Sequence, residues 1–537
     1  MQLLLESIVI TQFTGDLMLF GTDGIRGLVS LDAVSESDAI GLIQNERVLT
    51  PTLMRTLGQA LAIWQERTGV AVIGWDRRPG NEKLVEALTQ GLVMEGMTVT
   101  HGGVCATPAL HQSLLAQGGD IGCMITASHN PVSDSGIKVF DRDGYKTTPE
   151  IEMMLSNLVE QIAAEDQDFD FEDLKTYSLP SSVFSADSLH KENIRNRTND
   201  YAPIAGDHIS QTLLLDCSKG APHTWLSNLI NEYGVECEEV SHKAEDMNLN
   251  CGAGELSPTD KWTFEEAALS SHLLIKSLRK HPPGLVVGAA LDGDGDRCLM
   301  IRSTKLGFEV IDGDEMADII LRTAKGPFQL AASIESDLSL LTSLTRLDAE
   351  VLAIQTAVGD RWLSAALRSI HADGKGILDM ETLPNCLGVE DSGHIVLPKR
   401  HPLDENKSVL VGDGSATLMA VLSAMAKQSP IAAMQRGFKQ RISIKGTDRR
   451  LWDGKNELAI KVFAIIVGSL DSPEMKPVSG EANLLLVLGE NYSIGVRNSG
   501  TEAKTNISLR LAAGIDEEPY LLVVQQIETL LRKSLVP

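Results

Sequence analysis

The sequence has no excess of positive charge. Among its 537 residues, lysine and arginine number 47 against 73 aspartates and glutamates, which gives a formal net charge of −26. A surface this acidic argues against a general nucleic-acid binder and against binding to an anionic membrane. A local cationic site for an anionic substrate remains compatible with it. We therefore expect no nucleic-acid partner and no membrane partner.

Long apolar runs and paired cysteines are also missing. No run approaches the roughly 18 apolar residues that a membrane span needs, and the first residues lack the features of a signal peptide. The 7 cysteines are odd in number and none is spaced as CxxC, which argues against a disulfide scaffold or a zinc ribbon. These absences favour a cytoplasmic protein.

What the sequence does have is alternation of strand-like and helix-like segments. Residues 70–76 form a short apolar run typical of a buried strand, and residues 51–69 and 82–97 on either side have helical spacing. The alternation restarts near Thr212 and again near Phe328. This pattern predicts an α/β protein with three consecutive α/β domains, whose sheets are mixed and largely parallel.

The last hundred or so residues differ from the rest. The short strand-like runs RISIKG, LLLVLG, YSIGVR and NISLRLA precede one helix-like segment, which predicts a smaller α+β domain. An acidic stretch at 163–173 reads as a solvated linker. The predicted domains are 1–200, 201–304, 305–428 and 429–537.

The strongest local motif is LDGDGDR, residues 291–297, which follows a buried apolar run. Asp292, Asp294 and Asp296 can converge on one hard cation, and the glycines between them let the backbone turn tightly. An acidic turn with no ion is the simpler alternative. An EF-hand is excluded, because its sixth and twelfth loop positions would be Arg297 and Ser303. The all-oxygen donor set favours Mg²⁺.

A second motif, TASHNP, ends another buried run. Ser128 would project from the carboxyl edge of the sheet, where α/β proteins bind ligands, and could act as a nucleophile. A simple turn serine is the alternative. Because there is no GxSxG elbow and no triad, phosphoryl transfer beside a cation suits it better than acyl transfer.

Three further motifs are weaker when taken singly. RNSGTE offers Arg497, two hydroxyl groups and backbone N–H groups as a phosphate cradle, or could equally be a hairpin turn. FGTDGIRG is a tight loop that presents Arg26. GVEDSGH holds a carboxylate, a hydroxyl and an imidazole within five residues, which suits recognition of sugar hydroxyl groups.

Together these five motifs resemble the α-D-phosphohexomutases, which move a phosphoryl group between the 1- and 6-positions of a hexose. The order FGTDGIRG, TASHNP, DGDGDR, GVEDSGH, RNSGTE agrees with the family, and DRRP at 76–79 and VGDRW at 358–362 are lesser matches. The resemblance implies four domains around a central cleft. It also implies that Ser128 is phosphorylated in the active enzyme, passes its phosphoryl group to the sugar, and receives another from a bisphosphate intermediate.

The resemblance also implies residue roles. Ser128, Asp292, Asp294 and Asp296 would hold one Mg²⁺. His129 or Lys138 would move the hydroxyl proton, and Arg26 and Arg297 would stabilise charge, because arginine is a poor proton donor. The residues expected to bind substrate are Glu390, Ser392 and His394 at the sugar and Arg497, Ser499, Gly500 and Thr501 at the phosphate.

The choice of sugar rests on two segments. GVEDSGHI resembles the GEQSGHI of phosphoglucosamine mutases, and MNLNCGAG at 247–254 resembles their INxxCGA segment. We therefore expect interconversion of glucosamine 6-phosphate and glucosamine 1-phosphate, with a hexose 1,6-bisphosphate as activator. The alternatives are a phosphomannomutase/phosphoglucomutase, an N-acetylglucosamine phosphate mutase and, more remotely, a sugar phosphatase or a sugar-phosphate-binding protein.

Two features depart from the family. The chain is longer than the usual bacterial phosphoglucosamine mutase, notably around 150–199. RNSGTE is followed by AKTNISLR where the family more often has PKIRV-like residues. The expected partner is a small sugar phosphate, and the expected assembly is a monomer or a homodimer.

Overall fold

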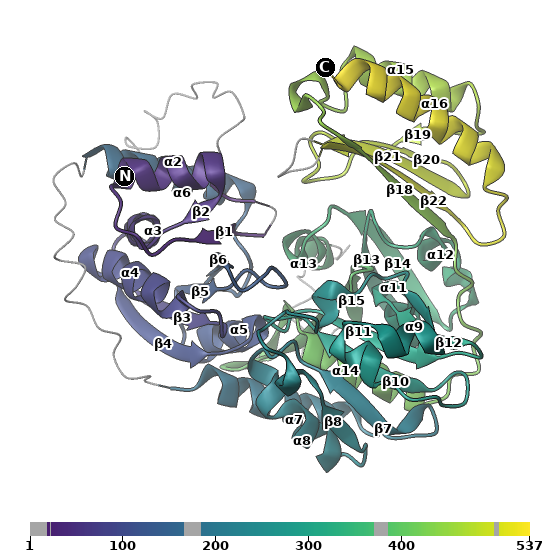
Figure 1. Ribbon diagram of the computed structural model, residues 1–537, viewed down its shortest axis with the longest axis horizontal. Helices are drawn as coiled ribbons and strands as arrows, with labels where there is room; N and C mark the ends of the chain where they lie inside the picture. Colours follow the sequence, from purple (N-terminus) through teal and green to yellow (C-terminus); the bar gives the residue numbers. More distant parts are fainter. Residues whose placement is uncertain (1–18, 22, 166–183, 370–384, 499–503, 537) are drawn as a thin grey trace.

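A computed structural model describes residues 19–21, 23–165, 184–369, 385–498 and 504–536. Within these ranges the strands form four sheets, which follow one another along the chain (Figure 1). The multidomain α/β fold expected from the sequence is confirmed, and the four sheets are described below as four units. No helix of the described part is long and apolar enough to cross a membrane.

The first unit has a six-stranded sheet in the order β2-β1-β6-β5-β3-β4. Helix α3 begins at Pro51 because the Thr50 side chain accepts the Leu53 N–H and proline suits the first helical position. Its buried face packs against α4 and α6. The strands are β1 (Ile25–Val29), β2 (Val48–Leu49), β3 (Val70–Trp75), β4 (Thr98–Val104), β5 (Ile121–Ile125) and β6 (Asp134–Asp141), and the helices are α2 (Glu36–Glu46), α3 (Pro51–Trp64), α4 (Asn81–Met94), α5 (Thr107–Ala116) and α6 (Pro149–Glu165).

The second unit has the strand order β8-β7-β10-β11-β12-β9. Its strands are β7 (Ile209–Asp216), β8 (Cys237–Glu239), β9 (Lys261–Thr263), β10 (Val286–Leu291), β11 (Cys298–Ser303) and β12 (Gly307–Ile311), and its helices are α7 (Ala186–Tyr201), α8 (Leu226–Glu232), α9 (Phe264–Leu269) and α10 (Leu273–Ser277). Strand β12 pairs with β11, so this sheet runs past the boundary predicted at 304. The exact division into domains stays a prediction.

The third unit has the order β14-β13-β15-β16-β17. Its strands are β13 (Gly326–Ser333), β14 (Ala349–Thr356), β15 (Cys386–Val389), β16 (Ile395–His401) and β17 (Asp404–Gly412), and its helices are α11 (Gly313–Leu321), α12 (Leu338–Thr342), α13 (Asp360–Ser369) and α14 (Gly414–Ala426). One hydrophobic core continues from the second unit into the third, through Met316 of α11 and Leu418 of α14. The unit with the metal loop (residues 292–297, between β10 and β11) and the unit with the sugar loop (residues 390–394, between β15 and β16) are therefore packed together.

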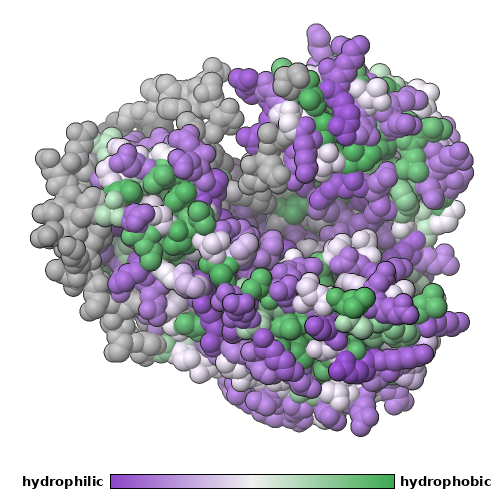
Figure 2. Space-filling model, viewed as in Figure 1, coloured by the Kyte–Doolittle hydropathy of each residue, from purple (hydrophilic) through white to green (hydrophobic). Residues whose placement is uncertain are grey.

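The fourth unit is entirely antiparallel, in the order β18-β22-β21-β20-β19. Its elements are β18 (Phe438–Lys445), α15 (Glu457–Val467), β19 (Glu474–Met475), β20 (Leu485–Leu488), β21 (Tyr492–Asn498), β22 (Lys504–Leu511) and α16 (Glu518–Leu535). Helices α15 and α16 cover the face of the sheet away from the third unit (Figure 1). Figure 2 shows that the molecule is hollowed between this unit and the rest, and that mostly hydrophilic residues are visible there.

Each of the first three sheets combines parallel and antiparallel pairs, which confirms the expected mixed sheets. Antiparallel pairs are as frequent as parallel ones, so the sheets are less parallel than expected. The serine loop (residues 126–133) joins β5 to its antiparallel neighbour β6, the metal loop joins β10 to β11, and the sugar loop joins β15 to β16. Such short connections return the chain beside the strand it has just left, so that the pair must be antiparallel. The expected motifs are therefore hairpin connections at strand ends.

Candidate active site

The serine loop holds Ser128 in a left-handed backbone conformation, with φ of 53°. Its side chain is buried and its N–H donates to Thr126 Oγ1 at 2.8 Å. The Ser128 hydroxyl donates to Asp292 Oδ2 at 2.7 Å. Ser128, the predicted nucleophile, therefore contacts Asp292, a predicted metal ligand, although the two residues belong to different units.

Two side chains from outside the loop fix its carbonyl groups. Arg78 Nη2 donates to the Ser128 carbonyl oxygen at 2.6 Å, and Asn248 Nδ2 donates to the same oxygen at 2.8 Å. Both also donate to the Asn130 carbonyl oxygen. Because left-handed backbone is unfavourable for a residue with a Cβ, these bonds explain how the conformation of Ser128 persists.

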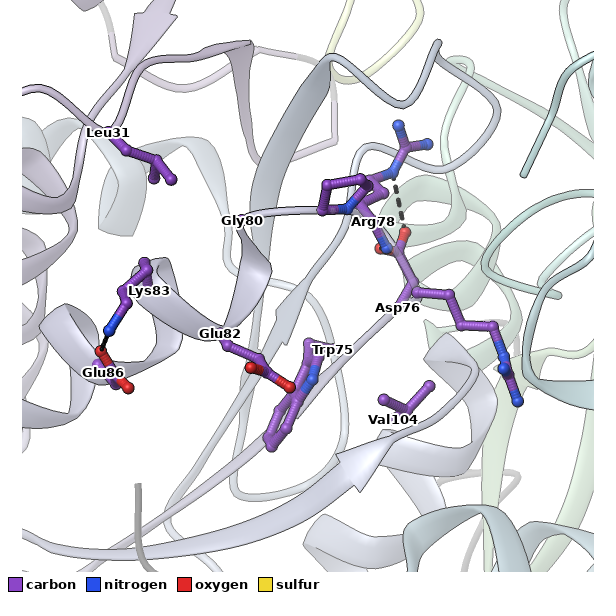
Figure 3. A pocket seen from close by; sticks show the side chains of 11 residues that line it. Leu31, Trp75, Asp76, Arg78, Gly80, Glu82, Lys83, Glu86 and Val104 are labelled. Atoms are coloured by element: carbon purple, nitrogen blue, oxygen red, sulfur yellow. Dashed lines mark hydrogen bonds and ion pairs between the residues drawn. The ribbon is translucent and has the colours of Figure 1, made fainter. Parts of the chain in front are cut away.

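Arg78 is itself held by Asp76, whose Oδ2 accepts from Arg78 Nε at 3.0 Å. Both residues line a cavity of about 430 Å³, together with Trp75, Val104 and the first turn of α4. Figure 3 shows the ion pair among these lining side chains. The guanidinium group turns away from that cavity, and it donates to carbonyl oxygens of the serine loop.

The metal loop brings three buried carboxylates together between β10 and β11. Oxygen atoms of Asp292, Asp294 and Asp296 all lie within 4.8 Å of one another. The loop needs glycine between them, since a Cβ at Gly293 would lie 2.8 Å from the Ser128 carbonyl oxygen. Gly295 has φ of 72°, which glycine adopts readily.

Lys138 of β6 neutralises part of this charge. Its Nζ lies 2.7 Å from Asp294 Oδ2 and 2.8 Å from Asp296 Oδ2. Burial alone would lower the pKa of Lys138, but Asp23, Asp294 and Asp296 raise it well above its usual range. Burial, reinforced by the two neighbouring aspartates, raises the pKa of Asp292 to about 7.

These residues fit a hard divalent cation. Asp294 Oδ1 is buried and has no hydrogen-bond partner among the described residues, which is a costly state for a carboxylate oxygen. The donors are all oxygen atoms, as Mg²⁺ and Ca²⁺ prefer. The structure thus supports a metal site at the predicted position, and the identity of the metal is a proposal made below.

Several cations surround the serine and the metal loop. Asp23 Oδ1 lies 2.7 Å from Lys146 Nζ, and its Oδ2 lies 3.2 Å from Lys138 Nζ and 3.3 Å from Arg26 Nη2. Burial would raise the pKa of Asp23, but these cations hold it well below its usual range. Asp23 therefore positions the predicted Arg26 and Lys138, together with Lys146.

The other two predicted groups near Ser128 differ in charge. The Arg297 backbone N–H donates to Asp292 Oδ1 at 3.2 Å, and its Nε lies 3.9 Å from Asp292 Oδ2. For His129, burial together with Arg297 and Arg26 lowers the pKa to about 4. At neutral pH His129 is an uncharged imidazole, whereas Lys138 keeps its proton.

The sugar loop lies against the metal loop. The Cys298 N–H donates to the Gly393 carbonyl oxygen at 3.0 Å, and His394 Nδ1 lies 3.6 Å from Asp296 Oδ1. Burial alone would lower the pKa of His394, but Asp296 and Asp360 raise it to about 10. Glu390 accepts the Gly359 N–H at 2.6 Å and the Ser392 hydroxyl at 3.2 Å, so the three predicted sugar-loop residues lie together at this site.

The phosphate loop, RNSGTE at residues 497–502, is described only in part. Arg497 lies on β21, where its Nη1 donates to Glu481 Oε1 at 2.7 Å and its Nη2 to Glu335 Oε1 at 2.6 Å. Ser499, Gly500 and Thr501 lie outside the described residues. Arg497 thus contacts the third unit through Glu335.

Sequence reasoning gave no role to several residues of this site. Arg78 and Asn248 lay in motifs that resemble family segments, DRRP and MNLNCGAG, and this was the available signal. Thr107, whose hydroxyl donates to Asp294 Oδ2, and Lys146 lay in no motif. Their contacts join segments far apart in the chain, so no local pattern indicates them.

The fold and the site define a class: a multidomain α/β protein in which a buried serine faces a group of three carboxylates. The match to family models supports this class. Residues 17–166 match the phosphoglucomutase/phosphomannomutase α/β/α domain I and residues 312–440 match domain III, together more than half of the chain. The chain belongs to the phosphoglucomutase/phosphomannomutase family.

Curated relatives and solved structures cover nearly the whole chain. A phosphoglucosamine mutase of Lacticaseibacillus casei is 28% identical, over 90% of this chain and 91% of that one. One of Listeria monocytogenes serotype 4b is also 28% identical, over 93% and 96%. A family protein from Burkholderia thailandensis has a TM-score of 0.62 at 17% identity, covering 96% and 97%. Aspergillus fumigatus N-acetylphosphoglucosamine mutase, solved with GlcNAc-6P and magnesium, has a TM-score of 0.55 at 14% identity, covering 97% of each chain. At these identities, the solved structures support the fold alone.

Proposed function

We propose that this protein is a phosphohexomutase that interconverts glucosamine 6-phosphate and glucosamine 1-phosphate. The observation that carries the proposal is the 2.7 Å hydrogen bond from the Ser128 hydroxyl to Asp292, within a group of three buried carboxylates. A serine placed beside a hard-cation site suits transfer of a phosphoryl group. The choice of the amino sugar is supported by the GVEDSGH and MNLNCGAG segments and by relatives named phosphoglucosamine mutase.

In the proposed reaction, Ser128 carries a phosphoryl group when the substrate binds. A sugar hydroxyl attacks this phosphorus, the bond to Ser128 Oγ breaks, and a sugar bisphosphate forms. The hydroxyl proton must leave the sugar, and uncharged His129 is better suited than protonated Lys138 to receive it. The bisphosphate then reorients in the cleft, and its other phosphoryl group is transferred to Ser128. Ser128 is therefore phosphorylated again at the end of the reaction.

The surrounding residues supply fixed charge to this transfer. We assign Arg26, Lys138 and Arg297 to stabilising the negative charge of the transferring group, because preorganised cations in a buried site act strongly. Asp292, Asp294 and Asp296, with an oxygen of phosphorylated Ser128, would hold one Mg²⁺. Bound there, the ion would neutralise charge on the phosphoryl oxygens.

Substrate binding is assigned to the other two loops. Glu390, Ser392 and His394 would contact the sugar, and Arg497 with Ser499, Gly500 and Thr501 would hold the phosphate that is not transferred. We further propose that a hexose 1,6-bisphosphate phosphorylates Ser128 to activate the enzyme. The protein would act on free sugar phosphate in the cytoplasm, as a monomer or a homodimer.

The test is a coupled isomerase assay with Mg²⁺ and a trace of the matching bisphosphate. The kcat/KM values for glucosamine, N-acetylglucosamine, glucose and mannose 6-phosphates are compared, and glucosamine 6-phosphate is expected to lead. Ser128→Ala should abolish turnover, whereas Ser133→Ala, at an exposed position of the same loop, should not. A preference for another sugar would overturn the substrate, and undiminished turnover by Ser128→Ala would overturn the mechanism. Release of inorganic phosphate in place of isomerisation would indicate a phosphatase.

A further inference from the structure

The fourth sheet has one apolar face and one polar face. Ile494 and Ile507 belong to the core beneath α15 and α16, and the partly buried Ile442 packs against it. Side chains alternate along a strand, so their neighbours in sequence face the other way, toward the third unit. The polar face carries Arg441 and Ser443 of β18, Arg497 of β21, and Asn506, Ser508 and Arg510 of β22.

Two arginines of this face converge on one oxygen atom. Glu335, in the turn after β13, accepts through Oε1 from Arg497 Nη2 at 2.6 Å and also from Arg441 Nη2. The register explains the convergence, because Arg441 lies opposite Ser508 and Arg497 opposite Asn506 on the shared neighbour β22. Two guanidinium groups from strands on either side of β22 thus meet at a single negative charge.

The third arginine of this face has a different environment. Arg510 is buried and donates to the Ser336 carbonyl oxygen and to Ser493 Oγ. It therefore connects the fourth unit to the third. Arg441 has 48% of its side chain exposed. It is therefore accessible to a ligand from solvent, whereas Arg510 is not.

We propose that Arg441 is a second phosphate-binding cation, which holds the substrate's non-transferred phosphate together with Arg497. In the free protein, the Glu335 carboxylate takes the place of that phosphate. A phosphate offers several oxygen atoms and more negative charge than a carboxylate, so two guanidinium groups bind it well. Glu335 would then compete with the substrate and leave when it binds. This inference rests on the proposed function, because that function supplies the phosphate ligand.

The first test measures binding without turnover. Inorganic phosphate is titrated calorimetrically into the full-length protein in the presence of EDTA, which leaves the metal site out of the measurement. Arg441→Gln and Arg497→Gln should each weaken binding by about tenfold, as expected for the loss of one charge-assisted hydrogen-bonding partner. Arg441→Lys, which keeps the charge, should lose less. Arg532→Gln is the control, because Arg532 is 52% exposed and pairs with Glu528 on α16.

A double variant tests whether the two arginines share one site. We expect the double variant Arg441→Gln, Arg497→Gln to lose less phosphate affinity than the product of the two single fold-losses. The reason is that two groups that hold one ligand are coupled. Full additivity, or binding by Arg441→Gln equal to that of the original protein, would overturn the proposal. Because the probe is inorganic phosphate and no isomerisation is measured, failure of the mutase assignment would not change this result.

Glu335→Gln tests the competition directly. Removing the carboxylate charge releases Arg441 and Arg497 from the acceptor that they share, although Arg497 still pairs with Glu481, so inorganic phosphate should bind several-fold more tightly. Weaker binding would show that Glu335 is needed to hold the arginines in place, and it would overturn the role of Glu335 as a competitor.

Discussion

Lys138 of β6 lies with its Nζ 2.7 Å from Asp294 Oδ2, so a cation of the first unit is buried against the metal loop of the second. The side chains of Lys138 and Asp294 are only 2% and 0% exposed. Lys138 also contacts Asp296 and Asp23. The ammonium group therefore links the strand after the serine loop to the carboxylates that would bind the metal.

Lys138→Met should destabilise the metal-free protein. Removing the ammonium group leaves the buried Asp294 carboxylate without its cationic partner and Asp296 with His394 alone, which lowers the free energy of unfolding by about 3 kcal/mol or more. Mg²⁺ should then raise the melting temperature more in the variant than in the original protein, because a cation replaces the lost charge. Thermal unfolding with and without Mg²⁺ measures both effects.

An exposed lysine provides the control for this prediction. Lys83 pairs with Glu86 one turn along α4, with 62% of its side chain exposed. Pairs of this kind contribute about 0.5 kcal/mol or less, so Lys83→Met should hardly change the melting temperature. Equal stability of Lys138→Met and the original protein without Mg²⁺ would contradict the role given to Lys138.

Arg78→Lys should lower kcat at least tenfold while the protein stays folded. Lysine keeps the charge but cannot donate at once to the carbonyl oxygens of Ser128, Asn130 and Asp134, which Arg78 does. The left-handed conformation of Ser128 then loses part of its support, and the nucleophile is misplaced. Steady-state assay and the extent of Ser128 phosphorylation by mass spectrometry measure the effect. The neighbouring Arg77 is exposed, so Arg77→Lys serves as the matched control.

The sequence was most informative where a motif is contiguous. Residues 70–75 and 286–291 form the predicted strands, and the three aspartates of one short loop form the predicted carboxylate group. The apolar spacing of residues 339–347 predicts one helix, but only Leu338–Thr342 is α-helical and a single turn of 3₁₀-helix, Leu344–Arg346, follows. Apolar spacing indicates that an element exists but not how long it is.

Strand direction and contacts across the fold were harder to predict. A buried apolar run reads the same in a parallel and an antiparallel pair, so β5 beside β6 could not be oriented from its residues. Ser128 and Asp292 are 164 positions apart, and only the family resemblance placed them together. Glu335 belongs to no motif, and its contact with Arg497 depends on how the fourth unit packs on the third.

Lys399→Met should change how stability depends on pH. Lys399 is buried and donates to Gln112 Oε1 at 2.6 Å. Burial, with Arg197 nearby, lowers the pKa of Lys399 to about 7, and Asp413 opposes this shift only in part. Below pH 7 the buried charge destabilises the fold. Between pH 7 and about 10 the unfolded chain binds more protons than the folded one, so this group makes stability rise with pH.

Melting temperatures between pH 6 and pH 9.5 test this sign. In Lys399→Met the increase of the melting temperature above pH 7 should be smaller than in the original protein. The variant should exceed the original protein in stability most clearly below pH 7. Lys407→Met, at an exposed position of β17, should leave the rise unchanged. The same slope in Lys399→Met and the original protein would contradict a buried lysine that loses its proton near neutral pH.

Asp391→Asn should weaken substrate binding through the sugar loop. Lys439 Nζ of β18 lies 2.5 Å from Asp391 Oδ2 and 3.6 Å from Asp314 Oδ2, so this ion pair ties the loop between Glu390 and Ser392 to the fourth unit. Without it, the loop is held less firmly and KM for glucosamine 6-phosphate should rise about three- to tenfold, with a smaller change in kcat. Lys439→Met should have the same effect, and the double variant should be no worse than either, because both changes remove one interaction. Steady-state kinetics of the three variants checks this, and an unchanged KM in both single variants would show that the loop keeps its position without the ion pair.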